Sequence, residues 1–279
     1  MKAGGYLGNI LRVDLTKRET RVESFDDKMA KRWIGGVGFG AHYLWEEIPA
    51  SVKWSDPENI MVWASGPLAG SGVYGAGTIN IAAKGPMTNL AGSSQANGFL
   101  GAYLKFSGFD AIIVQGRASQ PVYLWVKDGI AELRDASDFK GMDILKLESS
   151  LQKTLNVKHR QVSIHGIGPA GENLVRYASI GGDGGHFAAH NGLGAVMGSK
   201  NLKAIVIAKG NHKRSWPKRS GAWLNSVKAS CTYIGCSPHS VPSLSNVAIL
   251  APSGTYLGLA LSVVSAMNSR IAFLTGPSF

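Results

Sequence analysis

Cysteine is almost absent from this sequence of 279 residues, since only Cys231 and Cys236 occur and both lie near the C-terminal end. Two cysteines provide neither a disulfide framework nor the four ligands of a closed zinc site. The first residues contain no long apolar stretch, so we expect no secretory signal peptide. A reducing, cytoplasmic location follows from both observations.

Acidic residues are missing from positions 211–279, which contain six Lys or Arg and no Asp or Glu. The preceding residues, 1–210, carry 23 basic and 18 acidic side chains, so most of the net charge of +11 belongs to the last segment. We predict that residues 1–210 form one domain. Residues 211–279 are predicted to be a divergent tail that is either non-native or poorly ordered.

The charge pattern argues against two classes of partner. Nucleic-acid binding requires a basic stripe interleaved with exposed aromatic residues, whereas the lysines here are scattered, as is typical of a solvated face. The apolar stretch 246–267 is interrupted by Pro252, Gly254 and their polar neighbours, so we do not expect it to span a membrane. We therefore expect neither a nucleic-acid partner nor a membrane partner.

Most catalytic signatures are also missing. The sequence contains no Gly-x-Ser-x-Gly elbow and no cysteine nucleophile before the tail. The glycine run 35–40 fits no complete dinucleotide or P-loop pattern. The glycine run 35–40 is interpreted as the end of a helix and a turn, with a phosphate loop as the alternative. His186 and His190 have the spacing for a shared helical face, but no third metal ligand is near. His165 is a further histidine to weigh, and Asp183 and Glu172 are candidate acids or bases with no partner at a readable spacing.

Glycine, by contrast, is abundant, with 36 residues. Three small-residue loops, 66–77, 91–98 and 181–192, contain many of them. Loops that open helices present free backbone N–H groups, which suit a phosphate or pyrophosphate. Gln95, Asn97 and Asn191 add amides that can hydrogen bond to the edge of a heterocycle. The residues alone therefore favour binding of a large phosphorylated cofactor that contains a ring system.

Two segments repeat one design, in which a small-residue loop is followed by a helix and a buried strand. In residues 98–116 and 185–209, a Gly-Ala pair is followed at the same distance by Ala-Ile. A strand that runs into a Gly-Pro turn precedes both, at 63–70 and 165–172. The alternation of apolar residues predicts the other elements. These are a hairpin at 6–23, helices at 26–34, 41–47, 99–107 and 142–155, strands at 59–65, 78–84, 111–114, 161–165 and 174–180, and a hairpin at 121–134.

Five ordered motifs together resemble the N-terminal domain of the tungsten-dependent aldehyde ferredoxin oxidoreductases. They are Gly-Tyr-Leu-Gly-Asn-Ile-Leu-Arg-Val-Asp-Leu-Thr at 5–16, Ala-Ser-Gly-Pro-Leu-Ala-Gly at 64–70, Leu-Lys-Phe-Ser-Gly-Phe-Asp-Ala-Ile-Ile-Val at 104–114, Gly-Pro-Ala-Gly-Glu-Asn-Leu-Val at 168–175 and Gly-Ala-Val-Met-Gly-Ser-Lys-Asn-Leu-Lys-Ala-Ile at 194–205. The resemblance covers about residues 4–210. It implies an α+β, β-rich domain of two sheets related by a pseudo-two-fold duplication.

The resemblance also implies a function. Such a domain forms a saddle for a bis-pterin tungsten cofactor, and further helical domains supply a 4Fe-4S cluster bound by four cysteines. Enzymes of this kind oxidise aldehydes to carboxylic acids, pass electrons to ferredoxin or an iron–sulfur subunit, and can form homodimers, while relatives act on acyl thioesters. The cluster cysteines are absent here, so the chain resembles a truncated member that is inactive alone. The alternative is a non-catalytic domain that binds a phosphorylated ligand or a partner subunit.

The same comparison transfers a set of cofactor-binding positions to this chain. Two of them depart from the family pattern, because Thr78 and Phe187 stand where arginines are expected, which indicates different pterin contacts. Catalytic residues are not identified, and no metal ligands are assigned. The predicted cofactor-binding residues are Thr78, Gln95, Asn97, Gly98, Phe187, Ala188, His190, Asn191 and Gly192.

Overall fold

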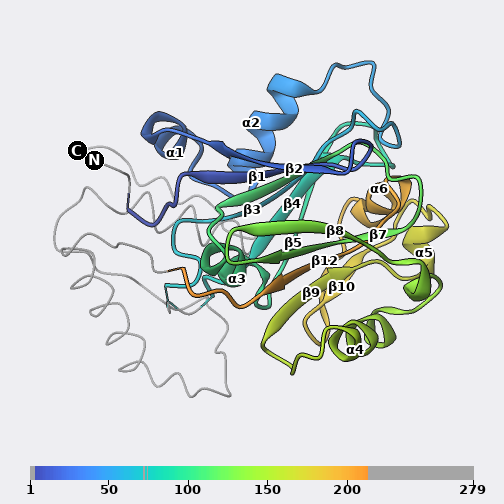
Figure 1. The fold of residues 1–279 in the computed structure, drawn as a ribbon. Helices are drawn as coiled ribbons and strands as arrows, with labels where there is room; N and C mark the ends of the chain where they lie inside the picture. Colours follow the sequence, from blue (N-terminus) through green and yellow to red (C-terminus); the bar gives the residue numbers. More distant parts are fainter. Residues whose placement is uncertain (1–3, 72, 74, 213–279) are drawn as a thin grey trace, which may run out of the picture. The chain divides into compact units, whose positions relative to one another are not determined.

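The computed structural model describes residues 4–71, 73 and 75–212, which form two six-stranded sheets with helices around them (Figure 1). Residues 213–279, most of the predicted tail, lie outside this range, and the domain boundary near residue 210 and the interpretation of the tail stay predictions. The elements in chain order are β1 (Asn9–Asp14), β2 (Glu19–Ser24), α1 (Asp27–Trp33), α2 (Val37–Glu47), β3 (Met61–Ser65), β4 (Ile79–Lys84), β5 (Ala91–Ala96), α3 (Leu100–Phe106), β6 (Ala111–Gln115), β7 (Val122–Lys127), β8 (Ile130–Asp135), the 3₁₀ helix η1 (Ser137–Phe139), α4 (Ile144–Thr154), β9 (Val162–Gly166), α5 (Pro169–Glu172), β10 (Ile180–Gly182), β11 (His186–Ala188), α6 (Leu193–Ser199) and β12 (Leu202–Ala208).

The two sheets have the same topology, which confirms the predicted duplication. The first has the order β2-β1-β6-β3-β4-β5, and the second has the order β8-β7-β12-β9-β10-β11. Each strand of the first sheet therefore corresponds to the strand six places later in the chain. The pairings agree as well, because β1 is parallel to β6 and β7 is parallel to β12, while the central β3 and β9 are antiparallel to their neighbours.

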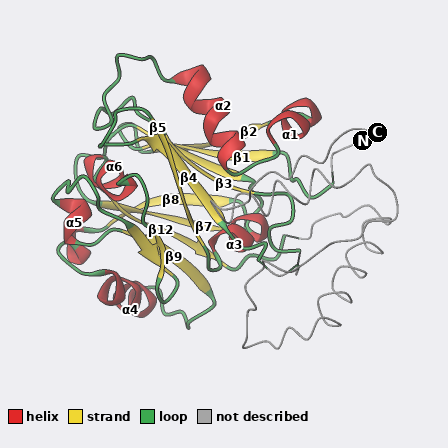
Figure 2. Ribbon diagram, turned by 180° about the vertical axis from the view of Figure 1, so that it is seen from behind, coloured by secondary structure: helices red, strands yellow, loops and turns green. Residues whose placement is uncertain are grey.

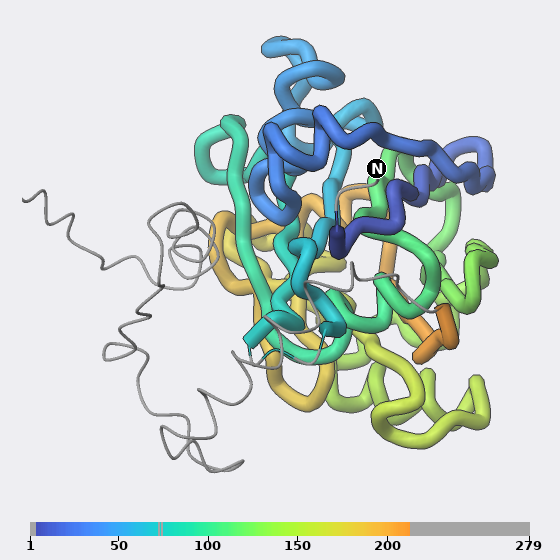
Figure 3. The backbone as a smooth tube through the Cα atoms, turned by 90° about the vertical axis from the view of Figure 1, so that its left-hand side faces the viewer, coloured from blue at the N-terminus to red at the C-terminus, as the bar shows by residue number. Residues whose placement is uncertain are grey.

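The largest core lies between the sheets. Alternating residues of both sheets, such as Trp63 and Ile112 in the first and Leu124 and Ile205 in the second, belong to one buried cluster. Apolar residues of α3 and α6 complete it. The outer face of the first sheet is covered by α1 and α2, and that of the second by α4 (Figure 2). In the view of Figure 3, the blue N-terminal elements lie at the top and the yellow-green α4 region at the bottom.

Glycines allow α2 to pack closely on β4. A Cβ atom on Gly40 would lie 2.4 Å from the Cβ of Ala82, and one on Gly38 would lie 2.0 Å from the carbonyl oxygen of Trp33. Gly35 has a φ of +137°, which favours glycine. The glycine run 35–40 therefore connects α1 to α2, in agreement with its interpretation as the end of a helix and a turn. However, α2 already begins at Val37 rather than at residue 41.

Three further predictions of local structure were wrong. Residues 181–192 are not one loop, because β10 and β11 form an antiparallel pair there. Residues 91–98 are not a loop, because Ala91–Ala96 form β5 and pair along their whole length with β4. Residues 174–180 are not a strand, since only Ile180 belongs to β10. The preceding segment is turn, with the N–H of Leu174 donating to the carbonyl of Gly171 and that of Val175 to Ala170.

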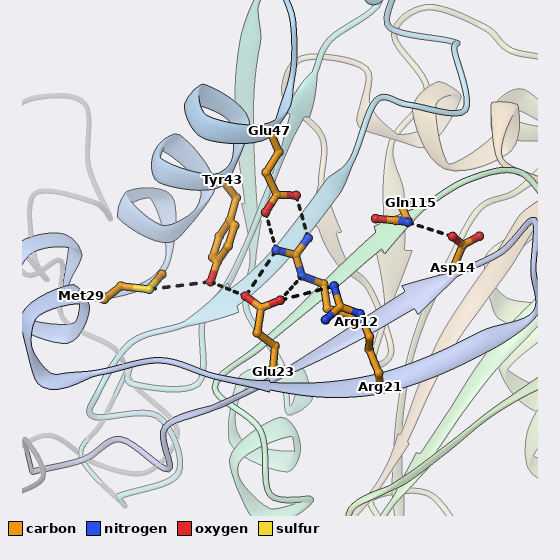
Figure 4. Close-up of polar contacts among 8 residues, drawn as sticks. All are labelled: Arg12, Asp14, Arg21, Glu23, Met29, Tyr43, Glu47 and Gln115. Carbon is orange, nitrogen blue, oxygen red and sulfur yellow. Dashed lines mark hydrogen bonds and ion pairs between the residues drawn. The ribbon is translucent and has the colours of Figure 1, made fainter.

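A buried arginine fastens α2 to the N-terminal hairpin (Figure 4). The Arg12 guanidinium, on β1, donates to both carboxylate oxygens of Glu47 at the end of α2, through Nη1 at 2.7 Å and through Nη2. Its Nε donates to Glu23 Oε2 of β2 at 2.9 Å. The guanidinium also lies 4.9 Å from the centre of the Tyr43 ring. Burial raises the pKa of Tyr43, as does the nearby Glu23 carboxylate.

We expect Arg12→Met to lower the free energy of unfolding by about 3 kcal/mol, because it leaves two carboxylates without their shared cation in a largely buried site. Urea denaturation measures the change. Arg21 is the matched control, since it also approaches Glu23, at 3.6 Å, but its side chain is 69% exposed. Arg21→Met should cost less than about 1 kcal/mol. Equal losses in the two variants would contradict the assigned role of Arg12.

Candidate functional site

The first group of predicted residues gathers at the end of β5. Thr78 Oγ1 lies 2.9 Å from Asn97 Oδ1, to which it donates, and 3.4 Å from the carbonyl of Gly75. This contact uses the amide oxygen of the exposed Asn97 side chain and leaves its NH₂ group available as a donor. Gly77 approaches the carbonyl of Gly98 so closely that a Cβ on Gly77 would lie 2.7 Å from it.

The second group lies beside the same strand. The backbone N–H of His190 donates to Ser94 Oγ at 3.0 Å, and Asn191 Nδ2 donates to the carbonyl of Ser93 at 2.7 Å. The Asn191 amide oxygen is thereby left as an acceptor. Both contacts join the loop after β11 to β5, although the two segments belong to different halves of the chain. β5 and β11 are the outermost strands of their sheets, so alternate backbone groups of each point away from the sheet.

The two groups occupy equivalent places in the duplicated fold. Ala96 pairs with Ile79, the first residue of β4, and Ala188 pairs with Ile180, the first residue of β10. Gln95 therefore corresponds to Phe187, which precedes Ala188. The half-buried Gln95 lies opposite Asn80 of β4.

Phe187 fills its position differently from an arginine. The side chain is 49% exposed, and its ring covers Gly181, where a Cβ would lie 2.4 Å from a ring carbon. Thr78, the other departure, directs its hydroxyl at Asn97. These two positions supply no cation, and the donors and acceptors around β5 are neutral amides, hydroxyls and backbone groups. The arrangement suits the polar edge of an uncharged ring better than a bare phosphate.

Asp183, weighed as an acid or base, is instead an acceptor of structural hydrogen bonds. Its Oδ2 accepts from the N–H of Phe99 and from Ser163 Oγ, both at 2.7 Å, and its Oδ1 accepts from the N–H of Ile164 at 3.1 Å. Glu172 likewise pairs with Lys203 and accepts from the N–H of Gly141 at 2.9 Å. Sequence spacing could not reveal these partners, because most of them lie far away in the chain.

His165 is fully buried on the inner face of β9, and neither of its ring nitrogens has a hydrogen-bond partner among the described residues. Its Nδ1 lies 3.8 Å from Asp183 Oδ2, beyond hydrogen-bond distance. Burial lowers the pKa of His165, against the opposing influence of Asp183. The position corresponds to Trp63 in the first half, whose Nε1 is also buried without a partner. His165 is therefore part of the core rather than a ligand.

Acid should destabilise the protein through His165. Because its pKa is lower in the folded chain than the ordinary value of about 6.5, the unfolded chain binds more protons as pH falls below that value, and stability declines. Thermal unfolding between pH 7.5 and 5.5 should therefore depend less on pH in His165→Leu than in the wild type. His212→Leu, at an exposed position, is the control. An unchanged pH dependence in His165→Leu would contradict the prediction.

The helical metal site considered for His186 and His190 is not formed, because His186 lies in a strand, β11. Among residues 4–71, 73 and 75–212, no group of three or more His, Cys, Asp or Glu side chains is placed to hold a metal ion. In the same part of the chain, no helix combines the length and apolarity needed to cross a bilayer. Cys231, Cys236 and the apolar stretch 246–267 lie outside the described residues.

These features define a duplicated double-sheet α+β domain with polar edge strands side by side. Residues 10–209 match the family model described as the aldehyde ferredoxin oxidoreductase N-terminal domain. The chain therefore belongs to the aldehyde ferredoxin oxidoreductase family, as its motifs suggested.

Characterised relatives agree with this assignment. The chain is 41% identical over 224 residues to a tungsten-containing aldehyde ferredoxin oxidoreductase of Pyrococcus abyssi, a match that covers 80% of this chain and 36% of the relative. A protein of the same description from Pyrococcus furiosus is 42% identical over 203 residues, covering 73% and 33%. The WOR-like subunit of an aliphatic sulfonate oxidoreductase from P. furiosus is 37% identical over 219 residues, covering 74% and 35%. The chain thus spans about a third of the length of these relatives.

One solved structure has the same fold. It is the active-site complex BamBC of benzoyl coenzyme A reductase in complex with 1,5-dienoyl-CoA, which matches with a TM-score of 0.79 and 33% identity. The match covers 86% of this chain and 37% of that one. This similarity agrees with the predicted class, a β-rich α+β domain of two related sheets.

Proposed function

We propose that this chain is the N-terminal cofactor-binding portion of a tungstopterin iron–sulfur oxidoreductase. The complete enzyme would oxidise a small aldehyde to the carboxylic acid and pass the electrons to ferredoxin or an iron–sulfur subunit. The observation that carries the proposal is the family match over residues 10–209 together with tungsten in the description of the relatives. A 4Fe-4S cluster and a cytoplasmic location belong to the same proposal.

The residues around β5 fit a pterin. Asn97 offers an amide NH₂ group and Asn191 an amide oxygen, and the amino-pyrimidinone edge of a pterin has both acceptors and donors. Ser93, which anchors Asn191, is four residues from Asn97, or about 13 Å along an extended strand. A ligand that reaches both amides must be long, as a phosphorylated pterin is. When bound, a tungsten–pterin group would supply the oxygen-transfer and redox chemistry.

The described residues would bind and orient this group rather than react. Gln95, between the two asparagines, adds a third amide on the strand. Thr78 holds the Asn97 amide in its donor orientation. The neutral side chains at positions 78 and 187 imply that the phosphates are bound by backbone N–H groups or by parts of the enzyme beyond this domain. Substrate-binding and catalytic side chains would also come from those parts.

Genomic DNA offers the most direct test of the proposal. We expect the sequence downstream of the Lys209 codon to encode, in one of its reading frames, the Cys-x-x-Cys-x-x-x-Cys spacing of the cluster ligands. A downstream region without that spacing in any frame would contradict the proposal. The isolated chain should contain neither tungsten nor iron in stoichiometric amount, which metal analysis can check.

Binding of a pterin by the chain itself tests the assigned residues. The probe is pterin-6-carboxylate, whose fluorescence reports the complex. Because this probe is too short to reach both amides, we expect it to bind at Asn97. Asn97→Ala should weaken binding about tenfold, the effect of one lost hydrogen bond of about 1.4 kcal/mol, and Asn191→Ala should weaken it less. Lys146→Ala, on the exposed face of α4, is the control and should bind like the wild type. An Asn97→Ala variant that binds the probe like the wild type would remove Asn97 from the site.

A further inference from the structure

We propose that Asp183 is a positioning residue for the candidate cofactor site. Its carboxylate, from the second half of the fold, would hold the segment 97–99 of the first half in the conformation that presents the Asn97 amide. This inference rests on the proposed function for the identity of the ligand, but the contact between the halves stands independently of it.

The hydrogen bonds of Asp183 join the two halves at one oxygen. Oδ2 accepts from the N–H of Phe99, at the start of α3, and from Ser163 Oγ of β9. The Asp183 side chain is only 3% exposed, so little water competes for these bonds. Hydrogen bonds to a carboxylate are stronger than those between neutral groups. Asp183 is therefore well placed to determine where the residues before Phe99 lie.

The contact between Asp183 and Phe99 requires a glycine at position 98. Its φ of +107° is strained for any other residue, and a Cβ would lie 2.6 Å from Asp183 Oδ2. On its other side, the Gly98 carbonyl is in close contact with Gly77. Gly98 is thus confined between a carboxylate of one half and the backbone of the other. Asn97 precedes it directly, so its position depends on the same contact.

The titratable side chains near Asp183 do not compete with these donors for its carboxylate. His165 is the nearest group that could carry a positive charge, but its Nδ1 lies 3.8 Å away. Since burial lowers its pKa, His165 is neutral near pH 7 and does not form an ion pair with Asp183. The Glu148 carboxylate accepts a hydrogen bond from the N–H of Gly184, the residue after Asp183, at 3.1 Å. The charge of Asp183 is therefore balanced by N–H and O–H donors, of which Phe99 is the one in the other half.

The test compares two variants that each remove part of the hydrogen bonding of this carboxylate. Asp183→Asn weakens the acceptor for Phe99, whereas Ser163→Ala removes a bond within the second half and leaves the contact between the halves. We expect Asp183→Asn to speed hydrogen exchange at the Phe99 amide about tenfold or more. It should also shift the NMR signals of the Asn97 side-chain amide and weaken binding of pterin-6-carboxylate by a similar factor. Ser163→Ala should leave all three unchanged.

Each outcome decides the proposal. If Ser163→Ala changes the exchange and the affinity as much as Asp183→Asn does, Asp183 has only a general structural role. If Phe99 exchanges faster in Asp183→Asn but the probe binds as before, the positioning role is wrong. If the wild-type chain does not bind the probe, the proposed function fails, and the Phe99 and Asn97 signals alone decide whether Asp183 positions the segment. If Asp183→Asn does not fold, a slowly exchanging Phe99 amide in the wild type supports the contact, and a rapidly exchanging one overturns it.

Discussion

Lys105→Met should lower the free energy of unfolding by about 3–5 kcal/mol, the usual cost of removing one partner of a buried ion pair. Lys105 and Asp110 are both buried, with side chains 0% and 1% exposed. The Lys105 ammonium donates to Asp110 Oδ1 and, at 3.0 Å, to the carbonyl of Gly5. Without it, the Asp110 carboxylate loses its cation in a buried site, where an uncompensated charge is costly. Urea denaturation followed by circular dichroism measures the loss.

An exposed pair of the same type provides the control for this prediction. Lys146 lies 3.8 Å from Asp143 on the surface, with side chains 76% and 55% exposed. Lys146→Met should change stability by less than about 1 kcal/mol. A loss of similar size in both variants would mean that burial does not determine the contribution of the Lys105 pair.

The buried pair of Lys105 and Asp110 also explains how residues 5–8, which lead into β1, are held. Asp110 Oδ2 accepts from the N–H groups of Leu7 and Gly8, at 2.9 Å and 2.7 Å. Asp110 directly precedes β6, which is parallel to β1. One carboxylate therefore fixes the segment that leads into β1 against the start of β6. Lys105→Met should consequently loosen the N-terminal segment as well as lower global stability.

Lysine burial is a property that the sequence did not reveal. Scattered lysines were interpreted as a solvated face, yet Lys84, Lys105, Lys200 and Lys203 are buried. Each donates to backbone carbonyls, as Lys200 does to Pro57 at 3.2 Å and Gly116 at 3.1 Å. Burial, with the nearby Arg117, lowers the pKa of Lys200 to about 7. These acceptors are main-chain carbonyl oxygens far away in sequence, so no pattern of residue types predicts that the lysines are buried.

The duplicated fold, by contrast, could be predicted because the two halves repeat the same residue types at the same spacing. The Gly-Ala pairs lie in α3 and α6, and the Ala-Ile pairs lie in the buried strands β6 and β12. Periodic apolar residues also located both hairpins and α4. The pattern failed at β5, whose Ala-Gly-Ser-Ser-Gln-Ala sequence has little intrinsic preference for a strand. Pairing with β4 determines its conformation, and such tertiary effects are invisible locally.

The candidate site was predictable to a similar degree. The polar residues selected from the sequence, Thr78, Asn97, His190 and Asn191, do lie along one edge strand, since equivalent places in two repeats are brought together by the fold. Ser93 and Ser94, which hold the second loop, were missed because they were assigned to a small-residue loop. The cross-half role of Asp183 was missed because Phe99 is 84 residues away in the chain.

Gly192 was predicted to bind the cofactor, but its surroundings give it a stronger structural role. Its φ is +63°, and a Cβ would lie 1.8 Å from the carbonyl oxygen of Arg176 and 2.8 Å from Cγ of Pro86. We expect Gly192→Ala to lower the free energy of unfolding by about 3–5 kcal/mol. Of this, about 1–2 kcal/mol comes from the left-handed conformation, and the rest comes from overpacking against backbone that cannot yield. Urea denaturation is again the measurement.

The Gly184→Ala variant measures the conformational contribution alone, without the overpacking expected at Gly192. Gly184 has a comparable φ of +77°, but a Cβ there would meet no atom within 4 Å. Gly184→Ala should therefore cost only the conformational part, about 1–2 kcal/mol. Equal costs at the two positions would show that the contact with Arg176 yields freely. A larger cost at Gly192 would show that Pro86 and Arg176, one from each half of the domain, lie too close to Gly192 to admit a methyl group.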